Sequence, residues 1–280
     1  MIVYFNEEFI SKEEVHISPD DRGFLFADGA YEVIRSYEGK LFKLDEHLKR
    51  LARSLRELRI TYSEINELKK VAEKLIRINN LSEGQALIYI QVTRGKAPRT
   101  HFFPKEKTIP TVYVAASVFH YDPQKLVKGI KIILVPETRW KRCDIKSVAL
   151  LPNVLARQQA KDNVADEAVF VRDGIITEGT HTNFCAVFEG QLFTHPINNC
   201  ILAGITRKVV LDLCSKMNIP VVESPIAETK LKEADELMIV GTTVEISPVV
   251  KVDDLKIGNG EPGPITLELQ RRFYLLLEQS

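Results

Sequence analysis

The chain has 280 residues, of which 45% are hydrophobic. That share is typical of globular proteins and argues against intrinsic disorder. Lysine and arginine together number 38, and so do aspartate and glutamate, so the formal net charge is zero. This balance does not favour binding to nucleic acid, which calls for a basic excess, but it leaves room for a local pocket that binds one phosphate group.

The cysteines and the distribution of apolar residues exclude further classes. The four cysteines are scattered without a CxxC pair, so neither a zinc site nor a dense disulfide framework is predicted. The first residues, MIVYFNEEFI, lack the basic and apolar regions of a secretory signal. No stretch approaches the roughly 20 apolar residues that a membrane helix needs. We therefore expect a cytoplasmic protein that binds neither metal, membrane nor nucleic acid.

In the first half of the chain, strands and hairpins come first, then two helices, then two more strands. Two strand-like runs within 31–44 flank Glu38-Gly39, which fits a hairpin turn. Leucines recur at three- and four-residue spacing from Leu44 to Leu58, a pattern that indicates an amphipathic helix packed on a core. Composition predicts three more elements, a helix over 63–80 and strands over 85–95 and 111–119.

The second half opens with a predicted strand at 131–136. Helices are expected near 153–163, 205–217 and 264–278, with short strands between them. Residues 120–130 are polar and turn-prone and are the expected interdomain linker. The pattern predicts two α+β domains, with an N-terminal domain over 1–119, a linker over 120–130 and a C-terminal domain over 131–280.

Lys146 precedes an apolar run, Ala149-Leu150-Leu151. An amine attacks a carbonyl only when it is unprotonated, and burial lowers the pKa of a lysine because the charged form loses its hydration. Lysines in such places more often extend the ammonium to water. Taken alone, the residue leaves both interpretations open.

Glu178 lies in IITEGTHTNFCAVF, between two strand-like runs. The segment is either an ordinary connection between two strands or a functional turn. In the second case the Glu178 carboxylate would project into a cleft beside hydroxyl and amide groups. Arg99 and His101 lie one residue apart between two prolines, and alternation in an extended segment points both side chains the same way. They could form a two-pronged clamp for a carboxylate, or an exposed basic loop.

Two glycine-containing segments could bind an anion. Gly204 precedes a predicted helix whose first turn holds Ile205 and Thr206, and free backbone N–H groups at such a helix start attract phosphate. VGTTVE, which contains Thr242, is a second turn that could donate to phosphate. Arg50, on the first helix, could supply positive charge. Glycines at helix starts and solvated helix arginines are both common, so each signal is weak alone.

The order of these motifs resembles that of the fold-type IV pyridoxal-phosphate enzymes, which include branched-chain aminotransferases, D-amino acid aminotransferases and aminodeoxychorismate lyases. CDIKS, TEGTHTN, GITR and a late GTT turn follow one another, and the similarity runs from 21–34 to 245–250. RWKRCDIKS, YIQVTRGKAPRTHFFP and GITRKVV look most like the D-amino acid aminotransferases. The resemblance implies a two-domain α+β fold with pyridoxal 5'-phosphate in the interdomain cleft.

The resemblance also implies roles for individual residues. Lys146 matches the lysine that bonds covalently to the cofactor and then moves a proton between substrate and cofactor. Glu178 matches the carboxylate that faces the pyridine nitrogen and keeps it protonated. The residues that match the phosphate site are Arg50, Thr242 and the backbone amides of Ile205 and Thr206.

Tyr31, Arg99 and His101 match the carboxylate trap of the D-amino acid enzymes. In that family the arginine and the histidine come from the neighbouring subunit, so the resemblance implies a homodimer. Two positions depart from the pattern. His181 and Gly241 both stand where those enzymes carry a serine, and each could alter hydrogen bonding beside the cofactor.

The function so implied is a D-amino acid transaminase that moves an amino group from donors such as D-alanine to 2-oxoglutarate, giving pyruvate and D-glutamate. A branched-chain L-amino acid aminotransferase and an aminodeoxychorismate lyase are the alternatives, and the pair Arg99 and His101 argues against both. A scaffold protein that had lost catalysis would lack the lysine, the glutamate or the phosphate site, and all three are present.

Overall fold

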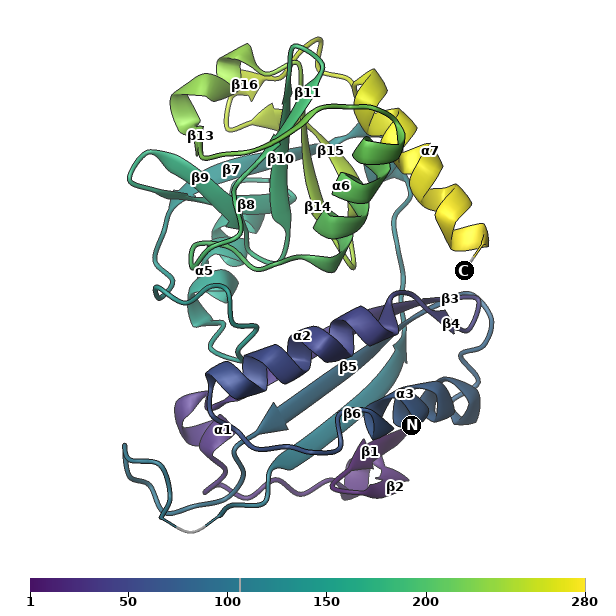
Figure 1. Ribbon diagram of the computed structural model, residues 1–280, viewed down its shortest axis with the longest axis vertical. Coiled ribbons are helices and arrows are strands. Elements are labelled where there is room, and N and C mark those ends of the chain that lie inside the picture. The colour runs from purple at the N-terminus through teal and green to yellow at the C-terminus, as the bar shows by residue number, and fades with distance from the viewer. Residues whose placement is uncertain (106, 280) are drawn as a thin grey trace. The chain divides into compact units, whose positions relative to one another are not determined.

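The computed structural model describes residues 1–105 and 107–279 (Figure 1). Its internal contacts divide the chain into two compact units. Unit 1 is Met1–His120 together with Ile145–Ala149, and unit 2 is Tyr121–Asp144 together with Leu150–Ser280. The segment that carries Lys146 therefore packs with unit 1. Both units mix helices with strands, as the predicted α+β fold requires. The domain boundaries predicted at 119 and 131 stay a prediction.

Unit 1 is built on a six-stranded antiparallel sheet in the order β2-β1-β6-β5-β3-β4. Its strands are β1 (Ile2–Phe5), β2 (Glu8–Ser11), β3 (Gly29–Tyr37), β4 (Lys40–Leu41), β5 (Gln85–Thr93) and β6 (Thr111–Val118). Its helices are the 3-10 turn η1 (Lys12–Glu14), α1 (Arg22–Phe26), α2 (Leu44–Glu57) and α3 (Glu67–Ile78). Helices α2 and α3 pack against each other and on the sheet (Figure 1).

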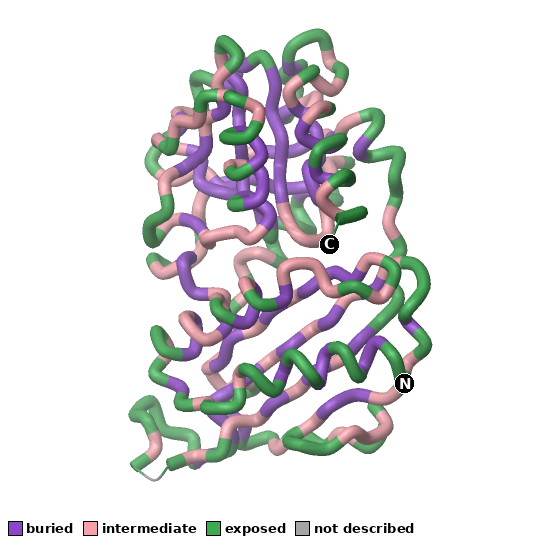
Figure 2. Tube along the Cα trace, turned by 45° about the vertical axis from the view of Figure 1, so that its right-hand side comes forward, coloured by how far each residue is buried: buried purple, intermediate pink, exposed green. Residues whose placement is uncertain are grey.

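The core of unit 1 follows from sequence periodicity. Leu48, Leu51 and Leu55 of α2 are buried against the sheet, as the leucine spacing predicted. Strand β5 alternates buried and half-buried residues, so one of its faces lines the core. The predicted helix over 63–80 is confirmed but is shorter, running from Glu67 to Ile78. Figure 2 shows the buried residues following the strands.

The predicted hairpin at Glu38-Gly39 is confirmed and joins β3 to β4. Both residues have positive φ, 48° and 79°, which matches the turn type that suits the twist of two-residue hairpins. A side chain at position 39 would also meet the carbonyl oxygen of Ser82 at 2.9 Å. Glycine at this position therefore satisfies both the backbone conformation and the close approach.

Unit 2 contains a ten-stranded sheet that closes on itself. Because β10 pairs with both β14 and β9, strands β10, β14, β15, β7, β8 and β9 form a ring, and the core fills its interior. The strands are β7 (Ile130–Pro136), β8 (Glu167–Arg172), β9 (Ile175–Gly179), β10 (Asn183–Phe188), β11 (Gln191–Thr194), β12 (Val221–Glu223), β13 (Ile226–Ala227), β14 (Glu236–Gly241), β15 (Glu245–Val252) and β16 (Leu255–Lys256).

Helices surround this ring. They are α4 (Gln124–Lys128), α5 (Leu151–Asp162), α6 (Ile205–Lys216), the 3-10 turn η2 (Glu228–Glu233) and α7 (Pro264–Glu278). The helices predicted near 153–163, 205–217 and 264–278 are thus confirmed as α5, α6 and α7. Arg207 holds the first turn of α6 in place, because its buried guanidinium donates to the His195 carbonyl (2.9 Å) and to Glu223 (2.6 Å).

Two findings concern sites of other kinds. Within residues 1–105 and 107–279, no helix is long and apolar enough to cross a membrane. The same residues contain no group of three or more histidine, cysteine, aspartate or glutamate side chains arranged to hold a metal ion.

Candidate active site

In unit 1, the backbone around Lys146 is fixed against β3 and α2. The Lys146 carbonyl accepts a hydrogen bond from the Tyr31 N–H (3.0 Å), and the Val148 N–H donates to the Gly29 carbonyl (3.1 Å). On the other side, the Lys146 N–H donates to the Ser54 hydroxyl (3.2 Å). These bonds attach the segment to the start of β3 like a short extra strand.

The Lys146 side chain is half-buried and turns toward β3. Its Nζ lies 4.3 Å from the centre of the Tyr31 ring, a distance at which an ammonium is attracted to the ring face. The structure thus brings together two of the predicted residues, Lys146 and Tyr31. The Tyr31 ring is followed along the sheet by Tyr89 at 5.9 Å. Burial raises the pKa of the Tyr89 hydroxyl to about 12, so this hydroxyl stays protonated at neutral pH.

Arg50 makes a two-pronged ion pair inside unit 1. Its Nε and Nη2 donate to the two oxygens of Glu32, at 2.7 and 2.8 Å. Glu32 is fully buried and also contacts His47 Nδ1 at 2.7 Å. Burial alone would raise the pKa of Glu32, but the charge and hydrogen bonds of Arg50, with His47, lower it to about 2. This network fixes the position of the Arg50 guanidinium.

Neither Glu32 nor His47 was predicted to be part of the site. A signal was present for Glu32, because it occupies a core-facing position of β3 between Ala30 and Ile34, both fully buried. A carboxylate at such a position needs a cationic partner. Nothing in the sequence identified that partner as Arg50, which lies 18 residues further on.

Arg99 and His101 lie together on the exposed loop that follows β5. The Arg99 guanidinium carbon is 5.4 Å from the centre of the Phe26 ring, and the His101 ring centre is 5.6 Å from it. The two side chains therefore point to the same place, as alternation in the segment predicted. Neither makes a hydrogen bond to Tyr31 or Lys146 among the residues that the structure describes, so unit 1 alone does not assemble the predicted trap.

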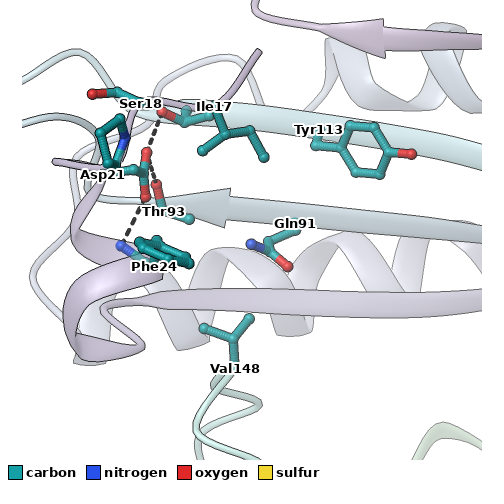
Figure 3. A pocket seen from close by; sticks show the side chains of 11 residues that line it. Ile17, Ser18, Asp21, Phe24, Gln91, Thr93, Tyr113 and Val148 are labelled. Atoms are coloured by element: carbon teal, nitrogen blue, oxygen red, sulfur yellow. Dashed lines mark hydrogen bonds between the residues drawn. The ribbon is translucent and has the colours of Figure 1, made fainter. Parts of the chain in front are cut away.

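A pocket of about 520 Å³ opens on the sheet of unit 1 (Figure 3). Ile17, Phe24 and Val148 give it apolar walls. Its polar end is Asp21, which accepts hydrogen bonds from the hydroxyl of Thr93 (3.0 Å) and from other neighbours. Val148 is two residues from Lys146, and the pocket-lining Gln91 is the cross-strand partner of Tyr31. The pocket thus lies beside these two predicted residues.

In unit 2, Glu178 is the penultimate residue of β9 and is buried. One carboxylate oxygen accepts from Arg139 Nη1 at 2.6 Å. The other accepts from Asn183 Nδ2 at 3.1 Å and from the Leu202 N–H at 2.9 Å. Three donors, one of them a permanent cation, stabilise the negative charge of this carboxylate.

Arg139 was not predicted as a site residue. Its side chain is largely buried, donates two hydrogen bonds to Glu137 at 2.9 and 2.7 Å, and lies 4.3 Å from the centre of the Phe170 ring. Burial alone would lower the pKa of Arg139, but its bonds to Glu137 and Glu178 raise it. The sequence RWKRC does not reveal which of its two arginines contacts Glu178. Arg142 pairs with the nearby Asp144.

Asn183, at the start of β10, connects Glu178 to helix α6. Its amide donates to Glu178 and to the Leu202 carbonyl (2.9 Å). A side chain at Gly204 would come within 1.8 Å of Asn183 Oδ1, so α6 begins against Asn183 only because residue 204 is glycine. Ile205 then opens the first turn of α6, where backbone N–H groups have no intrahelical partner.

Thr206 follows Ile205 in this first turn and is buried. Thr242 belongs to the turn between β14 and β15, next to Gly241. A side chain at Gly241 would lie 3.3 Å from the His181 carbonyl oxygen and 3.5 Å from Thr182, so this turn borders the start of β10. Unit 2 thus gathers Glu178, Ile205, Thr206 and Thr242 around Thr182-Asn183.

His181, which departs from the family pattern, is tied to a buried carboxylate. Its Nδ1 lies 3.0 Å from Glu167, which also accepts from the Thr180 hydroxyl (2.6 Å). Burial alone would raise the pKa of Glu167, but the charge of His181 and its other neighbours lower it to about 2. This contact ties the turn at 180–182 to Glu167, and none of the Glu178 hydrogen bonds given above involves His181.

Each unit, taken by itself, presents groups that suit a phosphate-bearing pyridine cofactor. Unit 2 supplies a buried carboxylate for a ring nitrogen and a helix start for a phosphate. It also holds the buried Thr182 hydroxyl, which has no hydrogen-bond partner among the described residues and so has a donor to offer. Unit 1 supplies the Lys146 amine.

Comparison with known proteins agrees with this chemistry. The family described as amino-transferase class IV matches residues 29–252. The D-alanine aminotransferase of Staphylococcus haemolyticus is 42% identical over 277 residues, which covers 99% of this chain and 98% of that protein. Among solved structures, the branched-chain amino acid aminotransferase of Escherichia coli superposes with a TM-score of 0.91 at 27% identity, covering 98% of this chain and 94% of that one.

A further solved structure bears on the cofactor. The T.th. branched-chain amino acid aminotransferase, complexed with N-(5'-phosphopyridoxyl)-L-glutamate, has a TM-score of 0.87 at 26% identity over 98% of this chain and 92% of that one. The chain belongs to the class IV aminotransferases. Enzymes of this family depend on pyridoxal phosphate. The fold-type IV assignment made from the sequence is confirmed.

Proposed function

We propose that this aminotransferase acts on D-amino acids, moving the amino group of donors such as D-alanine to 2-oxoglutarate, with pyruvate and D-glutamate as products. The observation that carries the proposal is the 42% identity, over nearly the whole chain, to a D-alanine aminotransferase. The paired cations Arg99 and His101 support it. A branched-chain L-amino acid activity is the alternative, favoured by the structural similarity to enzymes of that name at 26–27% identity.

The proposed cofactor is pyridoxal 5'-phosphate, which when bound withdraws electrons from the substrate and so stabilises a negative charge at Cα. Lys146 would hold it covalently. After the substrate has taken the place of the lysine, Lys146 Nζ would remove the proton from Cα and return it on the cofactor side. Its backbone, fixed by Tyr31 and Ser54, would keep the amine in reach of both positions.

Glu178 would face the ring nitrogen of the cofactor and hold a proton there. A carboxylate does this best when it is buried and carries its full negative charge. Arg139, Asn183 and the Leu202 N–H stabilise that charge without protonating the carboxylate. They also fix its orientation, so Arg139 and Asn183 act as positioning residues for Glu178.

The phosphate would bind at the start of α6. The backbone N–H groups of Ile205 and Thr206 point out of the first turn, where the helix dipole favours an anion. Thr242 would donate from the neighbouring turn, and Arg50, held by Glu32, would supply the positive charge. Together these groups would anchor the ring while its reacting carbon exchanges partners.

The proposed active form is a homodimer in which Arg99 and His101 of one subunit, with Tyr31 of the other, bind the substrate carboxylate. Both side chains are exposed in the single chain, where they are available to a second copy. Among the described residues of unit 1, neither side chain forms a hydrogen bond to Tyr31. This agrees with a trap in which they bind the substrate together with Tyr31 of the other subunit. A cytoplasmic location remains part of the proposal, and cell fractionation would test it.

Product analysis tests the proposed reaction. Purified enzyme supplied with pyridoxal phosphate is incubated with 2-oxoglutarate and either D-alanine or L-leucine. The proposal predicts pyruvate and D-glutamate from the first mixture, identified by chiral chromatography, and little turnover of the second. Formation of L-glutamate from L-leucine, without turnover of D-alanine, would assign the enzyme to the branched-chain class.

A further inference from the structure

Phe26, the last residue of α1, contacts three cationic or aromatic groups. The guanidinium carbons of Arg22 and Arg99 lie 4.8 and 5.4 Å from the centre of its ring. The His101 ring centre lies 5.6 Å away, with the two ring planes at 51°. Both residues of the proposed carboxylate clamp therefore rest on one aromatic side chain of their own chain.

Arg22 fixes the backbone between these two residues. Its Nη1 donates to the Thr100 carbonyl at 2.8 Å, and its Nε donates to Asp28 at 2.9 Å. Asp28 is held in turn by Arg94, through bonds of 2.7 and 2.9 Å. Arg22 and Arg94 are buried, whereas Thr100 is exposed. A buried ion network thus reaches out to hold an exposed loop.

The base of the loop is attached to the same region. The Arg22 N–H donates to the Gly95 carbonyl (3.0 Å), and the Ala97 N–H donates to the Asp20 carbonyl (3.2 Å). Beyond this base, Arg99 and His101 themselves have no hydrogen bond among the described residues. Contact with Phe26 is what constrains their side chains.

We propose that Phe26 is a positioning residue that preorganises Arg99 and His101 to bind the substrate carboxylate, with Arg22 holding the peptide between them. The inference rests on the proposed function, which assigns the clamp. An arginine in water samples many rotamers, and binding must restrict them. The negative face of the Phe26 ring holds the guanidinium in one region and still leaves its N–H groups to the substrate. A leucine would fill the space but would not attract the cation.

This role predicts an effect on binding. None of the ring or cation contacts of Phe26 given above involves the Lys146 segment, so proton transfer is expected to continue at its normal rate. Substrate carboxylates would bind more weakly, because the clamp residues would have to be ordered when each substrate arrives. KM would rise while kcat changed little.

The test compares four variants of the full-length dimer loaded with pyridoxal phosphate. Phe26→Leu removes the aromatic face, and Phe26→Tyr keeps it. Phe42→Leu is the matched control, the same change at another ring of unit 1 that faces a cation, Lys43 at 5.8 Å. Arg99→Ala removes part of the clamp itself. Each is assayed for KM and kcat with D-alanine, and for inhibition by D-lactate, which carries the carboxylate but no amine to react.

The inference predicts that Phe26→Leu raises KM for D-alanine and the inhibition constant of D-lactate together, by roughly three- to tenfold, as expected for the loss of one or two exposed cation–π contacts. Phe26→Tyr and Phe42→Leu should stay near wild type, and all variants should unfold at similar temperatures. If Phe26→Leu proves unstable, Phe26→Met repeats the test with a flexible apolar side chain.

The outcomes distinguish the positioning role of Phe26 from the carboxylate clamp itself. If Arg99→Ala raises KM and Phe26→Leu does not, the positioning role is wrong and the clamp stands. Should Phe26→Leu lower kcat while KM stays constant, the positioning role is also wrong. If Arg99→Ala itself leaves KM and D-lactate inhibition unchanged, the clamp assigned in the proposed function is wrong, and the role of Phe26 is overturned with it.

Discussion

The surroundings of Glu178 in unit 2 differ sharply from those of Arg99 and His101 in unit 1. Glu178 is buried and accepts three hydrogen bonds, all from its own chain. Arg99 and His101 are exposed and rest on a single aromatic ring. In the proposed enzyme, the group that serves the cofactor is fully prepared within one chain, whereas the groups that bind the substrate are prepared only in part and are completed by a second copy.

The largest effect is expected at the lysine. Lys146→Ala should reduce transamination by about 10³-fold or more, because the residue would supply both the covalent bond to the cofactor and the proton transfer. The protein should stay folded, since the residue's backbone bonds do not depend on the side chain. Lys141→Ala, which changes an exposed lysine of the same segment, is the control. Retained turnover in Lys146→Ala would contradict the assigned chemistry.

Glu178→Gln tests the buried site around Glu178. The amide cannot hold a proton on the ring nitrogen, and it would face Arg139 without a negative charge. We expect each half-reaction to slow by about 10²- to 10³-fold, measured by rapid mixing with D-alanine and with pyruvate. Glu261→Gln, at an exposed position, should leave both rates unchanged. Normal rates in Glu178→Gln would remove this residue from the site.

Arg99→Ala tests the exposed carboxylate clamp, which a second subunit is proposed to complete. Removing one side of a desolvated charge pair should weaken the binding of α-carboxylate substrates by roughly 2–4 kcal/mol. If the clamp is shared between subunits, mixing the inactive Lys146→Ala protein with the weakly binding Arg99→Ala protein under conditions of subunit exchange should raise activity at low substrate concentration, because one site of each hybrid would have both residues. Mixtures no more active than their components would argue against a shared site.

The buried pair of Glu32 and Arg50 predicts a pH dependence of stability. The folded-state pKa of Glu32, about 2, lies below its ordinary value of 4.5. Its stabilisation is therefore present above pH 4.5 and is lost as the pH falls toward 2. The shift corresponds to about 3 kcal/mol of unfolding free energy. Denaturant unfolding between pH 6 and 2.5 should show this loss, and Glu32→Gln should flatten that part of the profile. An unchanged profile would show that the pair does not stabilise the fold.

Local patterns in the sequence predicted much of the fold. The leucine spacing of α2 and the Glu38-Gly39 turn depend on neighbouring residues, and both are confirmed. The start of α3 was misplaced by four residues, since the helix begins at Glu67 and its N-cap residue Asn66 makes no side-chain capping hydrogen bond. A helix end without such a cap leaves little mark in the sequence.

The candidate site was predicted less completely, for a physical reason. Lys146 and Glu178 stand in motifs that can be recognised, but the groups that hold them are distant in the chain. Arg139 reaches Glu178 across 39 residues. Phe26 stands in an unremarkable helix, and only the folded loop brings Arg99 and His101 onto its ring. Partnerships of this kind depend on tertiary packing, which a single sequence does not display.

The central claim is that Lys146 binds a cofactor that accepts the amino group of D-amino acids. The most direct measurement is the visible absorption of the purified protein loaded with pyridoxal phosphate, recorded before and after separate additions of D-alanine and L-leucine. We expect a visible band that is absent from Lys146→Ala and is lost on addition of D-alanine but not of L-leucine. Loss of the band with L-leucine alone would contradict the D-amino acid assignment, and a protein that never acquires the band would contradict the role of Lys146.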